Sequence, residues 1–250
     1  MSFSKISKVA ALIVFAALVA GPGGTATVFK SGAERVDLVE LYTSEGCSSC
    51  PPAEQWFSEL KDSSNLWIKF VPVSFHVDYW DRLGWDDPLA LEDYTARQYL
   101  YAQKWDSRAV YTPGFVLNGK EWRQWRNVPE PPREMSAAVG DLVVEALANN
   151  QFRVSFFPTS NEVKAWQASA ALLGFDIVSP VKRGENKGKT LEHNFSVVGF
   201  AQSALKKDGN AYTALISVKR HGKLAPKRFG VAVWVSSDGI TPAQSVGGYL

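Results

Sequence analysis

Cysteine is scarce in this sequence, whose 250 residues contain only Cys47 and Cys50. No second C-x-x-C and no His-x-x-x-His follows them, so the four ligands of a closed zinc site are lacking. A glycine-rich phosphate loop, a Gly-x-Ser-x-Gly elbow and internal repeats are absent too. The cysteine pair is the main chemical motif of the sequence.

The sequence also lacks an apolar run long enough to span a membrane, which needs about twenty such residues. The run from Val9 to Ala20 is shorter, follows Lys5 and Lys8, and leads into small residues that end at Ala26. This pattern predicts a secretory signal peptide over residues 1–26, cleaved after Ala20 or Ala26. We expect a periplasmic or secreted protein without a permanent membrane span. Removal of the signal peptide leaves 25 basic and 25 acidic residues, so we expect no nucleic-acid partner.

The two cysteines stand where a predicted strand is followed by a predicted helix. Apolar residues crowd positions 36–41, as in a strand covered on both faces. After a short turn, Ala53, Trp56, Phe57 and Leu60 recur at the spacing of one helix face. The positive end of a helix favours the thiolate, which is the nucleophile of disulfide exchange. The position therefore predicts a redox-active pair.

Two other interpretations of the pair stay open. A structural bridge is one, although so short a loop constrains the unfolded chain weakly and exported proteins that rely on disulfides often carry several. Part of a metal site is the other. His76 ends the second predicted strand, and two thiolates with an imidazole suit Cu(I). We expect the remaining histidines, His193 and His221, on the surface.

The rest of the first half alternates between strands and helices. Residues 66–75 are rich in β-branched and aromatic side chains, which predicts a strand, and a polar loop with several aromatic residues follows over 76–88. Helical spacing predicts a helix over Leu91–Trp105, and Asn118-Gly119 predicts a two-residue hairpin. Residues Pro131–Leu147 predict a further helix that begins with proline.

The second half has a different pattern, with short apolar or alternating runs between turn residues. Five strands are predicted, over 152–157, 170–178, 195–201, 212–218 and 229–235. This spacing is typical of an antiparallel, sandwich-like β-rich part. We therefore predict a leader over 1–26, an α/β domain over 27–150 and a β-rich domain over 151–250.

Several strings carry a resemblance to a known family: Tyr42-Thr-Ser-Glu-Gly-Cys-Ser-Ser-Cys-Pro-Pro-Ala-Glu54, Phe75-His-Val-Asp-Tyr-Trp-Asp81, Tyr111-Thr-Pro113 and Gly184-Glu-Asn-x-Gly-x-x-Leu191. They resemble an uncharacterised secreted thioredoxin-like family, known as domain of unknown function 1223, over most of the mature chain. The resemblance implies a thioredoxin-like fold for residues 27–150, in which helices flank a central mixed sheet. It also implies a redox dyad, and it supplies no substrate.

The same resemblance implies roles for single residues. Cys47 would be the attacking thiol and Cys50 the buried resolving thiol. The loop facing them would hold Thr112-Pro113, joined by a cis peptide bond. Glu40 would be a buried acid that shuttles the proton of the resolving thiol, with a pKa raised by burial. The alternative is that Glu40 points to an open edge of the sheet or pairs with a nearby cation.

The leading hypothesis is an exported thiol–disulfide oxidoreductase that exchanges the Cys47–Cys50 dithiol or disulfide with a protein or small thiol partner. Tyr79 and Trp80, in the loop after the second strand, are candidates for a substrate rim, unless their rings only cover the sheet edge. We expect no cofactor and no resident metal. The alternatives are a copper-handling protein that uses Cys47, Cys50 and His76, and a non-catalytic binding protein with a recognition surface on its β-rich half.

Overall fold

The computed structural model describes residues 26–133, 138–222 and 224–250, so almost all of the predicted leader lies outside the described residues. The described chain is a mixed α/β structure, rich in strands, with two α-helices and several sheets. Across these ranges, none of the helices combines the length and apolar character that a membrane-spanning segment requires.

The largest sheet has eight strands in the order β15-β14-β8-β11-β3-β2-β4-β5. The bounds of these strands are β2 Asp37–Thr43, β3 Phe70–His76, β4 Gly114–Leu117, β5 Lys120–Glu121, β8 Gln167–Phe175, β11 Ser196–Ala204, β14 Arg228–Ser236 and β15 Gln244–Tyr249. At its centre β2 and β3 run parallel, and every residue of both strands is buried. The near-continuous apolar run around residues 36–41 therefore forms a central strand, as predicted.

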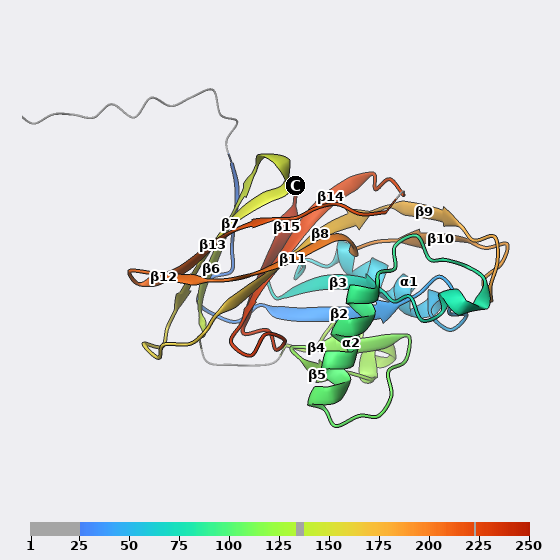
Figure 1. The fold of residues 1–250 in the computed structure, drawn as a ribbon, viewed down its shortest axis with the longest axis horizontal. Coiled ribbons are helices and arrows are strands. Elements are labelled where there is room, and N and C mark those ends of the chain that lie inside the picture. Colours follow the sequence, from blue (N-terminus) through green and yellow to red (C-terminus); the bar gives the residue numbers. More distant parts are fainter. Residues whose placement is uncertain (1–25, 134–137, 223) are drawn as a thin grey trace, which may run out of the picture.

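The two helices cover opposite faces of this centre. Helix α1 spans Pro51–Glu59, and its Phe57 ring packs edge-on against Phe115 of β4. Helix α2 spans Glu92–Lys104, and its Tyr101 packs against Tyr42 of β2. Phe115 pairs with Leu41 in the β2–β4 register, and side chains alternate between faces along a strand. Figure 1 shows α2 crossing in front of β2, β3 and β4.

The hairpin between β4 and β5 confirms the turn predicted at Asn118-Gly119. Both turn residues have positive φ, 50° for Asn118 and 81° for Gly119. Tight two-residue hairpins require this backbone, and asparagine and glycine adopt it readily. Four short 3₁₀ turns complete the helical elements of the described chain, at Leu60–Asp62, Asp81–Leu83, Gln124–Asn127 and Ala148–Asn150.

The helix predicted over Pro131–Leu147 is wrong where the structure describes it. Residues Gly140–Leu147 form strand β6, and residues 134–137 lie outside the described ranges. Leu142 and Val144 are fully buried while Asp141 is exposed, which is the two-residue alternation of a strand. The strand pairs with neighbours on both sides, and these long-range partners override the helical tendency of Glu145-Ala146-Leu147.

A second sheet has five strands in the order β1-β6-β7-β13-β12, and a small one pairs β9 with β10. Apart from β6, the strands of these two sheets are β1 Thr27–Lys30, β7 Gln151–Pro158, β9 Ile177–Pro180, β10 Thr190–His193, β12 Lys206–Asp208 and β13 Ala211–Ser217. Apolar side chains of the five-stranded sheet share one buried cluster with β8, β14 and β15 of the larger sheet. The β-rich part is thus built from facing sheets (Figure 1).

Both large sheets draw strands from before and after residue 150. Strand β11 continues the central sheet by pairing in parallel with β3 at Ser74, and β1 pairs with β6 in the five-stranded sheet. The predicted boundary at residue 150 therefore runs through shared sheets rather than along a linker. This sharing brings residues of the second half to the carboxyl ends of β2 and β3.

Candidate functional site

The two cysteines form a disulfide at the N-terminus of α1. Strand β2 ends at Thr43, the chain turns with Cys47 N donating to Ser44 O, and Cys50 caps the helix. Pro51 and Pro52 fill the first helical positions. Because proline has no N–H, two of the backbone donors that normally carry the positive potential of a helix N-terminus are missing here.

Both cysteines are completely buried, with exposed fractions of 0%, whereas Ser48 and Ser49 between them are exposed. Residues 184–189, which we call the covering segment, are hydrogen-bonded to the turn that bears the cysteines. Its Asn186 side chain donates hydrogen bonds of 2.9 Å to the carbonyls of Glu45 and Cys47. Glu185 accepts a 3.0 Å hydrogen bond from Ser48 N. In this structure neither cysteine is accessible to solvent.

The aromatic loop after β3 lies against the same turn. A Cβ added to Gly46 would stand 2.8 Å from the Cβ of Trp80, so this close approach requires glycine. The Trp80 indole donates a 2.7 Å hydrogen bond to the Thr112 hydroxyl. Tyr79 is tied to α2 through Gln98 at 3.4 Å, and burial raises its pKa to about 12. The structure thus brings together Trp80 and Thr112, two of the predicted substrate-binding residues.

The Thr112–Pro113 peptide bond is cis, as the resemblance implied. Tyr42 pairs with Gly114 in the β2–β4 register, so Pro113 stands beside the last residues of β2. A groove of ≈ 460 Å³ opens next to this loop. Its lining consists of Tyr111, Thr112, Pro113, Phe115, Trp122, Arg123, Trp125 and Arg126.

Glu40 forms a buried ion pair on the α2 face of the sheet. Arg97 reaches its two carboxylate oxygens at 2.8 and 3.1 Å, and the hydroxyls of Tyr42 and Tyr101 also donate to them. Burial alone would lower the pKa of Arg97, but the Glu40 carboxylate raises it. Among the described contacts none joins Glu40 to a cysteine. The structure shows instead that Glu40 pairs with a cation, as one of the alternative interpretations proposed. A catalytic role for Glu40 stays a prediction.

A second buried polar cluster lies on the α1 face, at the ends of β2 and β3. His193 lies between two carboxylates, with Nδ1 2.6 Å from Glu54 Oε2 and Nε2 3.0 Å from Glu45 Oε1. His76 Nδ1 lies 2.8 Å from Asp87 Oδ2. The rings of His76 and His193 meet edge to face, with centroids 4.9 Å apart. The expectation that His193 lies on the surface is wrong, because its side chain is 1% exposed.

The carboxylates control the protonation of this cluster. Burial alone would lower the pKa of His193, but Glu54 and Glu45 raise it to about 10. Burial opposes ionisation of Glu54 and Asp87, yet His193 and His76 respectively lower their pKa values below the ordinary range. The raised pKa favours the protonated form of His193, whose ring lies between the Glu54 and Glu45 side chains.

Sequence reasoning missed the role of most of this cluster, although Glu45 and Glu54 stand next to the cysteine motif. Glu54 follows Cys50 by four residues, so the two share one face of the helix start. Two acids flanking a buried motif signal that buried cations must be nearby. His221, also expected on the surface, is half-buried, with Nε2 2.6 Å from the Tyr94 hydroxyl. His76, the histidine considered as a copper ligand, lies within hydrogen-bond distance of Asp87 and packs against the ring of His193.

Comparisons with known proteins give a family and a fold. The model of the family described as "Protein of unknown function (DUF1223)" matches residues 38–236. Protein AGR_C_4864 from Agrobacterium tumefaciens is 24% identical in sequence, with 87% of this chain and 95% of that chain covered at a TM-score of 0.59. HBP35 of Porphyromonas gingivalis is 12% identical, with 87% and 76% covered at a TM-score of 0.56. No curated protein matches the chain. At these identities, the solved structures show a shared fold alone.

Proposed function

The chain belongs to the family of proteins of unknown function DUF1223, and we propose that it is a thiol–disulfide oxidoreductase with a thioredoxin-like site. One observation carries the proposal: the two cysteines of the sequence are joined at the N-terminus of α1, at the sheet end where the Thr112-Pro113 loop also stands. The elements from β2 to β5 support the thioredoxin-like assignment, with two parallel central strands, an antiparallel hairpin and a helix on each face.

The proposed reaction is a two-step exchange. A thiolate of the partner attacks the Cys47 sulfur, the Cys47–Cys50 bond breaks, and Cys50 leaves as a thiolate that takes up a proton. A second thiolate of the partner then attacks the mixed disulfide and releases Cys47. Two electrons pass from the partner dithiol to this protein, and the reverse sequence reduces a partner disulfide. The helix dipole stabilises the thiolate at this end of α1.

Burial of the disulfide adds a required opening step. Three hydrogen bonds tie the covering segment to the turn, two from Asn186 and one to Glu185. Ser48 and Ser49, between the cysteines, already reach solvent. Displacement of Glu185 and Asn186 would break the hydrogen bonds that hold the covering segment against the turn. We assign the covering segment as a gate between the resting protein and its partner.

The groove beside Thr112-Pro113 is the proposed contact surface for the partner chain. Arg126 stacks over Trp125 at 4.4 Å from the ring centroid, and the exposed Arg123, which pairs with Glu121 at 2.9 Å, lies on the same lining. Aromatic rings and guanidinium groups together favour an extended segment with acidic residues. The partner class is therefore a protein or peptide thiol whose flanking residues are acidic.

The proposed place of action is outside the cytosol, in the periplasm or the medium. This rests on the leader predicted over residues 1–26 and on the redox conditions in which a disulfide persists. Expression of the full chain with a C-terminal tag, followed by fractionation and N-terminal sequencing, tests it. A tagged chain that keeps residue 1 and stays in the cytosol contradicts this part of the proposal.

Covalent trapping tests the reaction. Cys50→Ser leaves Cys47 without its resolving thiol, so we expect mixed disulfides with exported partners that disappear on reduction. Cys47→Ser is the matched variant and should trap none, and the double serine variant gives the background. Equal trapping by the two single variants contradicts the roles given to Cys47 and Cys50. Absence of trapping by Cys50→Ser, even when Asn186→Ala is added to loosen the gate, contradicts the proposed activity.

A structural bridge is the second candidate, and one observation favours it. Both cysteines have exposed fractions of 0%, as expected of a bridge that never meets a partner. Against it stands the weak constraint that so short a loop places on the unfolded chain. A structural bridge predicts that removal of both sulfurs lowers the stability of the protein and changes no exchange reaction.

A further inference from the structure

The buried cluster behind the disulfide contains three side chains with metal-ligating atoms. Glu54 comes from α1, His76 from the end of β3 and His193 from the end of β10. One ligand atom from each lies within 4.8 Å of the other two, and all three residues are buried. Because each stands on a different regular element of the fold, their relative positions are fixed by the sheet and by α1.

Carboxylates hold both imidazole rings from behind. Asp87 Oδ2 lies 2.8 Å from His76 Nδ1, and Glu45 Oε1 lies 3.0 Å from His193 Nε2. Metal-binding histidines commonly have this arrangement, in which a carboxylate on one ring nitrogen orients the other nitrogen toward the metal. The Glu54 carboxylate is oriented as well, because the Thr43 hydroxyl donates to its Oε1 at 2.5 Å.

One nitrogen of this cluster has no partner. His76 Nε2 is fully buried and makes no hydrogen bond, and the other such side-chain atoms in the described chain are two indole nitrogens and two serine hydroxyls. A buried polar group left unpaired destabilises the folded protein. Of these groups, the imidazole nitrogen is the common metal ligand. A metal ion bound at Nε2 would remove that cost.

We propose that Glu54, His76 and His193 form a binding site for a divalent transition metal, with Zn²⁺ as the ion that suits the donors best. Two imidazole nitrogens and one carboxylate oxygen make a three-ligand zinc site with a fourth position for water or another donor. Asp87, Glu45 and Thr43 orient the ligands without binding the ion. Hard cations such as Ca²⁺ and Mg²⁺ prefer sites made of oxygen alone.

Metal binding requires the three ligand atoms, which lie within 4.8 Å of one another, to rearrange. Nδ1 of His193 and Oε2 of Glu54 lie 2.6 Å apart, as for two groups that share a proton. Two ligands of a tetrahedral zinc ion, each about 2.0–2.1 Å from the metal, stand about 3.3 Å apart. The pair therefore separates by about 0.7 Å when the ion replaces the shared proton.

The site is independent of the cysteines and goes beyond the proposed exchange reaction. Its ligands are nitrogen and oxygen, whereas the copper site considered from the sequence uses both sulfurs. Metal binding therefore persists in the oxidised protein, whose sulfurs are joined. This difference separates the outcome of the metal experiment from the outcome of the trapping experiment.

Titration of the metal-stripped, oxidised protein with Zn²⁺ by calorimetry tests the proposal, with Co²⁺ absorption as a report on coordination. We expect one ion per chain with micromolar or tighter affinity and a Co²⁺ spectrum typical of four-coordinate nitrogen and oxygen ligands. Glu54→Gln and His76→Ala should abolish binding, and Asp87→Asn should weaken it by about 10–100-fold. The double serine variant of Cys47 and Cys50 should bind as the wild type does.

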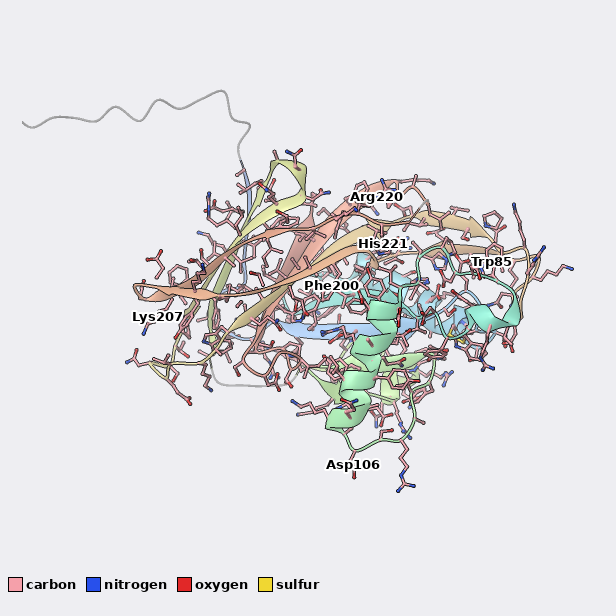
Figure 2. The ribbon with its side chains drawn as sticks, in the orientation of Figure 1. Trp85, Asp106, Phe200, Lys207, Arg220 and His221 are labelled. Carbon is pink, nitrogen blue, oxygen red and sulfur yellow. A yellow bond between two sulfur atoms is a disulfide. The ribbon has the colours of Figure 1, made fainter. Side chains whose placement is uncertain are left out.

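His221→Ala is the matched control, because the Nε2 of this histidine lies 2.6 Å from the Tyr94 hydroxyl of α2. Figure 2 labels His221 near one end of α2. This variant should leave Zn²⁺ binding unchanged. If His76→Ala fails to fold, Glu54→Gln, which keeps the shape of the side chain, decides. The proposal is overturned if oxidised wild-type protein binds no Zn²⁺ in the micromolar range. It is also overturned if binding survives in Glu54→Gln, or disappears in the double serine variant.

Discussion

Asn186→Ala should open the gate over the disulfide. Asn186 has an exposed fraction of 0%, and its amide donates to two buried carbonyls, those of Glu45 and Cys47. Each hydrogen bond contributes about 1 kcal/mol, so the variant loses about 2 kcal/mol of the free energy that holds the covering segment closed. If opening precedes attack on the sulfur, the reduction rate rises about 30-fold, because 1.4 kcal/mol corresponds to a factor of ten.

The assay is the rate at which excess dithiothreitol reduces the Cys47–Cys50 disulfide under native conditions, followed by alkylation and mass spectrometry. Asn210→Ala, at an exposed turn, is the control and should leave the rate unchanged. Urea unfolding of each variant separates gate opening from global unfolding, since the rate must rise by more than the unfolded fraction does. An Asn186→Ala rate equal to that of the wild type would refute the assignment of the covering segment as the gate.

Three further predictions concern the rest of the site. Arg97→Met should lower the free energy of unfolding by about 3–5 kcal/mol, because it leaves Glu40 charged and without its cation in the core. Adding Glu40→Leu should restore part of the lost free energy of unfolding. A double-mutant cycle measured by urea unfolding that shows no coupling would contradict the pairing. Arg126→Glu should slow exchange with an acidic peptide disulfide but not with a neutral one, whereas the exposed Arg108→Glu should slow neither; equal rates for all three proteins would remove the groove from the account. Burial raises the pKa of Asp81 to about 6, above the ordinary value of about 3.9, so the stabilising contribution of this side chain is present below about pH 4 and is lost as pH rises through 6. The stability of Asp81→Asn relative to wild type should therefore increase from pH 4 to pH 7. A constant difference across that range would contradict the raised pKa.

Local patterns in the sequence predict the first half of the fold well. The apolar run before Cys47, the helical spacing after Cys50 and the Asn118-Gly119 turn each depend on interactions between near neighbours. The structure confirms the strand β2, the helix α1 and the β4–β5 hairpin. The proline-led segment that ends in β6 does not follow its local tendency, because pairing with β1 and β7 decides its structure.

The buried polar cluster was beyond sequence reasoning for the same physical reason. His193 lies 139 residues from Glu54 and contacts it only because β10 and α1 are neighbours in the fold. The surroundings of the cysteines depend likewise on long-range contacts, since Asn186 reaches the turn from the second half of the chain. The string Gly184-Glu-Asn marked that segment as a family feature, but its position over Cys47 follows from the shared sheet.

The reduction potential of the Cys47–Cys50 pair tests the central claim most directly. Equilibration of the protein with graded mixtures of reduced and oxidised dithiothreitol or glutathione, followed by acid quenching and alkylation, gives this value. An exchange site should have a potential between about −270 and −120 mV, the range of soluble dithiol proteins. A potential below about −300 mV, as for bridges that serve only stability, would contradict the proposed activity.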